Sequence, residues 1–135
     1  MVQKEALAAL ADPELRAYVV WTPILDGDTA GAARRAAADL PADPRVTHYW
    51  DDGRALANSL GARLSLPGRG IAWDIYLVYP PRAAWPATDD APPPPARWMS
   101  QLDDVPPAQA PQLDGPLLRR WLTEAAPQAR GASRD

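Results

Sequence analysis

The stretch that decides the fold of this chain is YVVWTPILDGDT, residues Tyr18–Thr29. Its first half is dense in β-branched and aromatic residues, which is typical of a strand buried on both faces. Pro23 cannot donate a ladder hydrogen bond, so we expect the regular strand to stop near Thr22. The Asp-Gly-Asp turn that follows, with Asp28 or Thr29 as the N-cap, predicts a helix that continues to about Leu40.

The strand–turn–helix order then recurs further along the chain. The stretch Arg45–Trp50 predicts a second strand in which alternate side chains share one face, namely those of Val46, His48 and Trp50. A turn at Asp51, Asp52 and Gly53 follows it. Leucines spaced four residues apart then predict a second helix: Leu56, Leu60 and Leu64.

A third strand is predicted over Ile71–Tyr79, where apolar residues occupy both faces apart from Asp74. This pattern indicates a central strand. The turn at Pro80-Pro81 predicts a short antiparallel return strand at Ala84–Trp85.

The flanking segments differ in composition from this core. An alanine-rich helix is expected over residues 3–11, and twelve of the 17 prolines lie from Pro80 onward. We therefore divide the chain into an N-terminal helical segment (1–14), an α/β core (15–90), a proline-rich strap with a C-terminal helix (91–126) and a disordered tail (127–135). Three apolar residues are expected to hold the strap: Trp98, Met99 and Leu102.

Composition excludes several classes of function. The net charge of −3 argues against nucleic-acid binding through a basic face. The absence of cysteine excludes disulfides, thiolate metal ligands and thiol catalysis. No apolar run approaches the roughly 20 residues of a membrane span, and acidic residues occupy the place of a signal peptide's apolar region. We therefore expect a cytoplasmic protein that binds neither membrane nor nucleic acid.

The order of the elements resembles the thioredoxin fold, in which a parallel βαβ half is followed by a ββα half. This resemblance implies a single-domain α/β protein, a three-layer sandwich with a mostly parallel central sheet and one antiparallel edge hairpin. A flavodoxin-like or ferredoxin-like domain is the alternative. In thioredoxin relatives the active-site cysteines lie at the first strand–helix junction. The matching residues here, Pro23–Thr29, include no cysteine, so thiol–disulfide exchange is excluded.

Four aspartates follow the first two strands, and the carboxyl ends of parallel strands share one edge of a sheet. They are Asp26, Asp28, Asp51 and Asp52. Carboxylate oxygens suit Mg²⁺ or Ca²⁺, so Asp26, Asp28 and Asp51 are candidate ligands of a divalent metal. The alternative is that these residues cap helices and close turns.

Two further residues are candidates for acid–base chemistry. Asp74 is predicted inside a strand, where a carboxylate needs a partner, and His48 is the only histidine. With Asp26 and Asp28 they complete the catalytic candidates. The alternative is that Asp74 is paired or solvated and that His48 is a packed residue with a hydrogen bond.

Tryptophans recur close to these aspartates. The chain has six tryptophans and no phenylalanine. The tryptophans either line a pocket or take the place of phenylalanine in the core. The candidate ligand-binding residues are Trp21, Asp26, Asp28, Trp50, Asp51 and Trp73.

No nucleophile elbow, glycine-rich phosphate loop or cofactor motif is present in the sequence. We therefore expect a non-catalytic domain without a required cofactor that binds a protein partner or a small molecule. A homodimer formed through the tryptophan-bearing strap is a further expectation. The alternative function is a small carboxylate-dependent enzyme, with or without a divalent metal.

Overall fold

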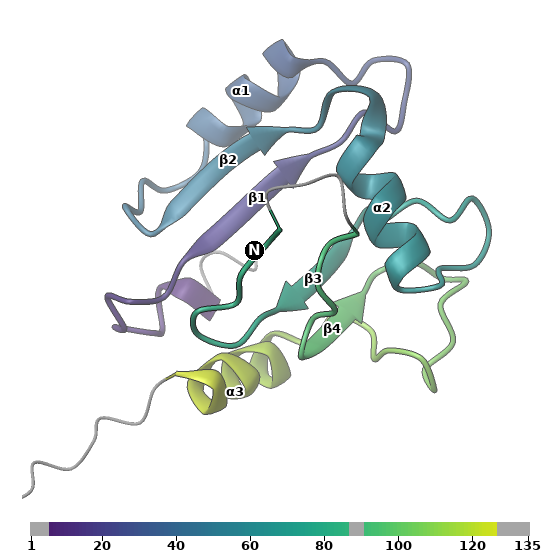
Figure 1. Cartoon of the computed structure of the whole chain (residues 1–135). Coiled ribbons are helices and arrows are strands. Elements are labelled where there is room, and N and C mark those ends of the chain that lie inside the picture. Colours follow the sequence, from purple (N-terminus) through teal and green to yellow (C-terminus); the bar gives the residue numbers. More distant parts are fainter. Residues whose placement is uncertain (1–5, 87–90, 127–135) are drawn as a thin grey trace, which may run out of the picture.

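The first half of the fold is a parallel strand–helix–strand unit. The structure, a computed structural model, describes residues 6–86 and 91–126. β1 (Ala17–Trp21) and β2 (Val46–Trp50) pair in parallel, and α1 (Ala30–Ala38) connects them (Figure 1). Thr29, rather than Asp28, caps α1, because its side-chain oxygen accepts a hydrogen bond from the backbone N–H of Ala32 at 3.1 Å.

The second half contains an antiparallel pair between two helices. A short 3₁₀ turn (η2, Asp52–Arg54) leads into α2 (Ala55–Arg63). β3 (Ile75–Val78) pairs antiparallel with β4 (Arg97–Ser100), and α3 (Gly115–Ala125) follows. The side chain of Asp114 caps α3 by accepting a hydrogen bond from the N–H of Leu117 at 2.7 Å.

The third strand is shorter than its sequence pattern predicts. Residues 71–74 lie outside β3 because Gly70 and Asp74 have φ angles of +63° and +50°, which are incompatible with extended backbone. The return strand expected at Ala84–Trp85 is wrong. The strand that pairs with β3 is β4, inside the segment that we expected to be a strap.

The prediction that β1 is buried on both faces is also wrong. Burial alternates along β1 and β2, so one face of the pair is partly covered while the other is open to solvent. Tyr18 is 64% exposed and Tyr49 is 52% exposed. Their rings lie against each other with centroids 6.2 Å apart.

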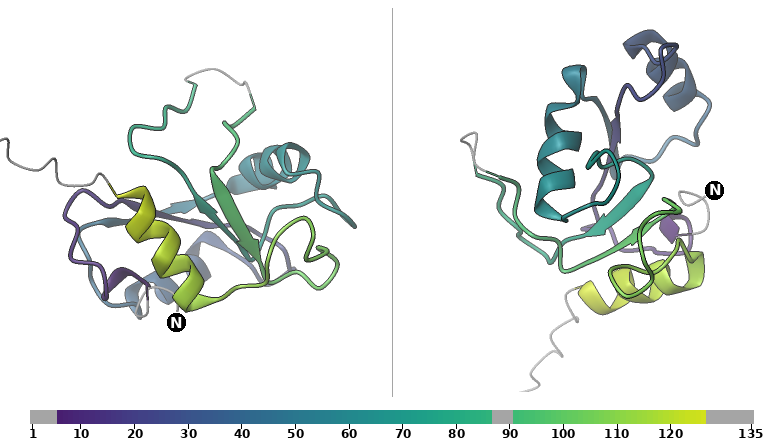
Figure 2. Two further views of the ribbon diagram at one scale, coloured as in Figure 1. Left: turned by 90° about the horizontal axis from the view of Figure 1, so that it is seen from below. Right: turned by 90° about the vertical axis from the view of Figure 1, so that its right-hand side faces the viewer.

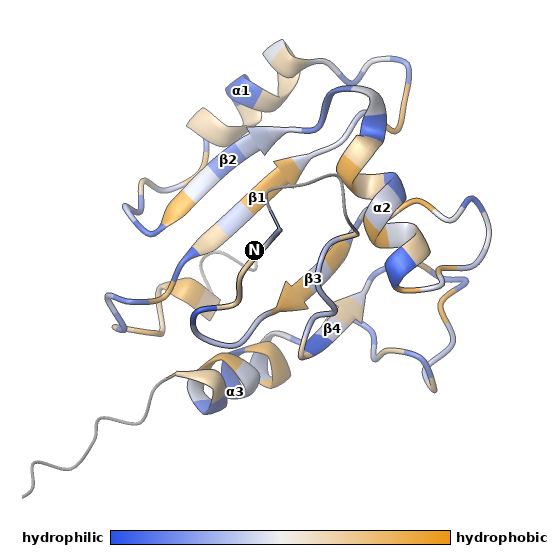
Figure 3. Cartoon of the chain, viewed as in Figure 1, coloured by the Kyte–Doolittle hydropathy of each residue, from blue (hydrophilic) through white to orange (hydrophobic). Residues whose placement is uncertain are grey.

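Two hydrophobic clusters lie on opposite faces of the β3–β4 pair. Under α2, Leu60 packs with Leu66 and Val105, and Ile75 and Leu77 of β3 contact this group. The second cluster lies under α3 and contains Ala6, Val78, Met99 and Leu118. Figure 2 shows α2 on one side of the strands and α3 on the other, and Figure 3 shows hydrophobic residues concentrated on β1 and β3. The chain is therefore an α/β protein built from three helices and two small sheets within the described residues.

Arg45 joins the N-terminal segment to this core. Of the helix expected over residues 3–11, the described part forms a helical turn over residues 6–9. The Arg45 guanidinium donates hydrogen bonds to the carbonyl oxygens of Leu7 (2.8 Å) and Leu10, and it pairs with the Asp43 carboxylate at 2.7 Å. Among the residues that the structure describes, no helix is long and apolar enough to cross a membrane.

Candidate functional site

A pocket of about 320 Å³ lies between α1 and the partly covered face of the β1–β2 pair. This volume is at the lower end of the range typical of small-molecule sites. The pocket collects the single histidine and two of the tryptophans. Its lining residues are Trp21, Ala30, Ala33, Arg34, Ala37, His48, Tyr49 and Trp50.

A hydrogen bond between neighbouring strands orders one wall of the pocket. In the parallel register Trp21 lies opposite Trp50, and Val19 lies opposite His48. Trp21 is therefore two residues beyond the residue that faces His48, on the same face of the strand pair. The indole Nε1–H of Trp21 donates diagonally to Nδ1 of His48 at 3.1 Å, and the two rings lie edge to edge, inclined by 25° with centroids 6.1 Å apart. Because Nδ1 accepts this bond, the neutral imidazole carries its proton on Nε2.

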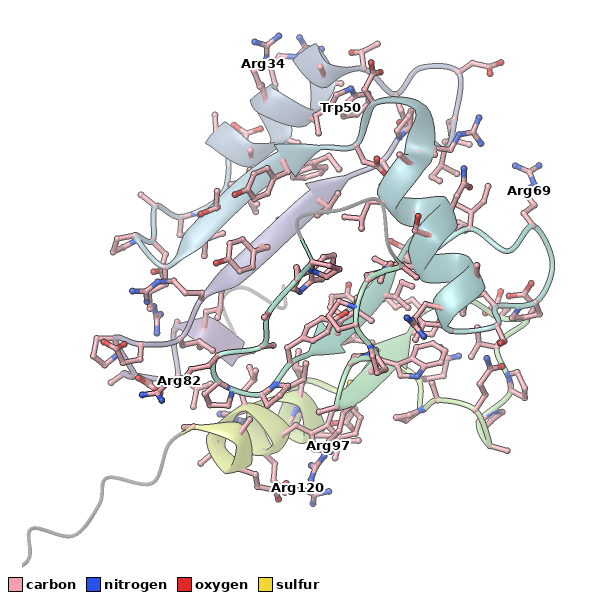
Figure 4. The ribbon with its side chains drawn as sticks, in the orientation of Figure 1. Arg34, Trp50, Arg69, Arg82, Arg97 and Arg120 are labelled. Carbon is pink, nitrogen blue, oxygen red and sulfur yellow. The ribbon has the colours of Figure 1, made fainter. Side chains whose placement is uncertain are left out.

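The helix supplies the opposite wall. Ala30, Ala33, Arg34 and Ala37 are spaced at i, i+3, i+4 and i+7, so they share the face of α1 that lies over the strands. Alanine side chains are short, and they leave the space that forms the pocket. Arg34 adds an exposed guanidinium at its rim. In Figure 4 the Arg34 side chain projects outward from α1, and Trp50 lies at the end of β2.

Asp28 and Asp51 are engaged with backbone amides instead of lining this pocket. One carboxylate oxygen of Asp28 accepts hydrogen bonds from the N–H groups of Ile24 (2.8 Å) and Leu25 (2.7 Å). These bonds hold the pKa of Asp28 below its ordinary value. The buried carboxylate of Asp51 accepts from the N–H groups of Leu56 (3.0 Å) and Ala57 (2.8 Å) at the start of α2.

The remaining sequence candidates lie apart from the pocket. Asp26 is exposed in the turn before α1, and Asp74 is exposed immediately before β3. Trp73 is 42% exposed and does not line the pocket. Among residues 6–86 and 91–126, no three side chains of His, Asp or Glu approach closely enough to hold a metal ion together. Of the three candidate metal ligands, Asp28 and Asp51 accept hydrogen bonds from backbone amides, and Asp26 is exposed.

A second hollow, of about 550 Å³, is larger and lies beside Arg45, between residues 8–16 and 42–45. The charged groups of Arg45 and Asp43 at this hollow already have partners within the chain. The Arg45 guanidinium is bound to backbone carbonyls and to Asp43, and its hydrogen bond lowers the pKa of the Asp43 carboxyl to about 2. We therefore interpret this hollow as the place where the N-terminal segment packs on residues 42–45, and the smaller pocket as the candidate site.

Of the residues expected at the site, Trp21, His48 and Trp50 are brought together by the structure. Arg34 was not among the residues that the sequence predicted for the site. The available signal was its spacing: Arg34 is four residues after Ala30 and three before Ala37, so it shares their face.

Comparisons with protein-family models, curated proteins and solved structures found no match to this chain.

Proposed function

We propose that this chain is a cysteine-free, thioredoxin-like domain that has no redox activity and binds a small molecule in the pocket under α1. The order β1–α1–β2–α2–β3–β4–α3, with a parallel pair followed by an antiparallel pair, supports a thioredoxin-like order of elements. Within the described residues the two pairs form separate sheets instead of the single central sheet that the sequence predicts. The single observation that carries the function is the pocket itself, in which two tryptophans and the only histidine converge under an alanine-lined helix face.

The chemistry of the lining favours binding over catalysis. His48 is held by Trp21 through Nδ1, so its free nitrogen is the protonated one and cannot serve as a base without losing that bond. In the part of the chain that the structure describes, no serine, threonine or carboxylate lines this pocket. The carboxylate-dependent enzyme has less support, because Asp28 and Asp51 are bound to backbone amides.

The proposal can be tested by NMR on ¹⁵N-labelled protein titrated with a chemically mixed set of small planar fragments. We expect binders to shift the indole N–H signals of Trp21 and Trp50. The signals of Trp98 and Trp121 should stay in place, because these residues belong to the two clusters beside β3 and β4. Assignment follows from the loss of one indole signal in each Trp→Phe variant.

Two variants on one helix provide a matched comparison. Ala37→Leu places a larger side chain in the pocket, whereas Ala38→Leu adds the same atoms at an exposed position of α1. We expect Ala37→Leu to abolish fragment binding and Ala38→Leu to preserve it. If no fragment moves the Trp21 and Trp50 signals, or if Ala37→Leu binds as the parent does, the pocket is not a binding site.

A further inference from the structure

Among the described residues, the side chains around the pocket under α1 offer hydrogen-bond donors and no free acceptor. Arg34 has a guanidinium, which only donates. Trp50 has an indole N–H, which also only donates. The one acceptor among the rings, Nδ1 of His48, is already bound to Trp21 at 3.1 Å. Nε2–H is therefore the group that His48 has left for a ligand.

The remaining members of the lining do not change this balance. Ala30, Ala33 and Ala37 present only methyl groups. Tyr49 carries a hydroxyl, but its side chain belongs to the opposite, solvent-facing side of β2, where its ring lies against Tyr18. Within residues 6–86 and 91–126, no aspartate or glutamate lines the pocket, although the chain as a whole has a net charge of −3.

A ligand that fits this surface must bring the acceptors itself. A carboxylate accepts hydrogen bonds at both oxygens and complements the charge of Arg34. The near-parallel rings of Trp21 and His48, which lie edge to edge, and the indole of Trp50 favour a flat, apolar body. The alanine wall adds apolar surface with no competing polar group, and a pocket of about 320 Å³ limits the ligand to a small one.

We infer that the ligand of this pocket is a small planar carboxylate, an aromatic acid whose ring packs on the tryptophans and whose carboxylate meets Arg34 and His48 Nε2–H. This inference rests on the proposed function, and it adds the chemical class of the ligand. Because Arg34 is exposed, solvent screens its charge, and we expect the carboxylate to improve affinity by about tenfold over a neutral analogue.

The test compares four probes by calorimetry on the full chain. Naphthoate is planar and anionic, naphthamide is planar and neutral, naphthylmethylamine is planar and cationic, and cyclohexanecarboxylate is anionic and not planar. We expect naphthoate to bind most tightly, by about tenfold over naphthamide, and cyclohexanecarboxylate to bind more weakly than naphthoate.

Two arginine variants separate a local contact from net charge. Arg34→Gln and Arg35→Gln remove the same charge from adjacent positions of α1, but only Arg34 lines the pocket. We expect Arg34→Gln to abolish most of the preference for naphthoate over naphthamide and Arg35→Gln to retain it.

The outcomes distinguish this inference from the proposed function. If naphthamide or naphthylmethylamine binds as tightly as naphthoate while the Trp21 and Trp50 signals still respond, the pocket binds ligands but the assigned class is wrong. Equal effects of the two arginine variants would also overturn it. If none of the four probes binds, the inference fails, and the response of Trp21 and Trp50 to the mixed fragments decides the proposed function separately.

Discussion

Asp51 shows how a residue placed like a ligand by its sequence position can serve the backbone instead. It follows a strand, as a metal-binding aspartate in an α/β protein would. The residue is 9% exposed. Its carboxylate accepts hydrogen bonds from the N–H groups of Leu56 and Ala57, two amide groups that have no helical partner in the first turn of α2. Asp28 satisfies Ile24 and Leu25 in the same manner.

Replacing Asp51 should therefore affect stability rather than metal binding. We expect Asp51→Ala to lower the free energy of unfolding by about 2 kcal/mol, because two amide hydrogen bonds are lost at a buried position. Asp52→Ala, at the exposed neighbour, should change it by less than about 0.5 kcal/mol. Urea denaturation measures both. Equal effects of the two substitutions would contradict the capping role.

The carboxyl group of Asp43 makes the stability of the fold depend on pH. Its hydrogen bonds with Arg45 lower its pKa from 3.8 to about 2 in the folded chain. A depressed pKa stabilises the fold above the unfolded value, and this contribution is lost as the pH falls through the folded value. We expect Asp43→Asn to lower the Tm at neutral pH, and the gap from the parent to close between about pH 4 and pH 2. A gap that is constant down to pH 2 would contradict this account.

At the scale of elements, a single glycine in α2 allows this helix to pack closely against the loop that precedes β3. A Cβ atom added at Gly61 would lie 1.7 Å from the carbonyl oxygen of Gly70. At Gly31 of α1, the nearest atom to an added Cβ is 3.6 Å away and belongs to the flexible side chain of Arg35. Both residues are helical glycines, so they have the same intrinsic propensity and differ only in their surroundings.

This difference predicts substitutions of opposite sign. Gly61→Ala gains about 1 kcal/mol of helix propensity but forces the loop backbone away, and we expect a net loss of roughly 1–3 kcal/mol. Gly31→Ala should gain up to about 1 kcal/mol. Thermal and chemical denaturation of the two variants check this pair. If Gly61→Ala is as stable as Gly31→Ala, the close approach of α2 to Gly70 is wrong.

The elements that the sequence predicts well are those with local signals. Thr29 and Pro41 bound α1, and the three-leucine stripe places α2. β4 has four residues, too few to display an alternation, and its partner β3 lies beyond a long proline-rich connection. The sequence shows only that Trp98 and Met99 are adjacent and apolar. In the structure they pack into opposite clusters, as neighbours on a strand buried on both faces do.

At the scale of the whole molecule, the candidate site depends on a register that no local pattern gives. Trp21, His48 and Trp50 could each be placed on a strand face from the sequence. Their convergence requires the parallel pairing of β1 with β2, which places Trp21 two residues beyond the residue opposite His48. The pocket also requires α1 to lie over that face with its alanines inward. Both are long-range facts of packing.

The two halves of the chain differ in how completely their side chains are buried. Most of the deeply buried side chains lie around β3 and β4, where α2 and α3 cover opposite faces. The β1–β2 half is covered less completely, and it holds the pocket. We expect this half to tolerate a bound ligand without repacking of the two clusters.

The most direct test of the account is a long-range ¹H–¹⁵N spectrum of the His48 imidazole, which is unambiguous because the chain contains one histidine. We predict that the neutral ring carries its proton on Nε2, since Trp21 donates to Nδ1, and that saturating naphthoate shifts the Nε2 signal. Trp21→Phe should weaken this preference toward that of a free imidazole. A proton on Nδ1 in the parent, or an Nε2 signal that no ligand of the pocket moves, would contradict the account.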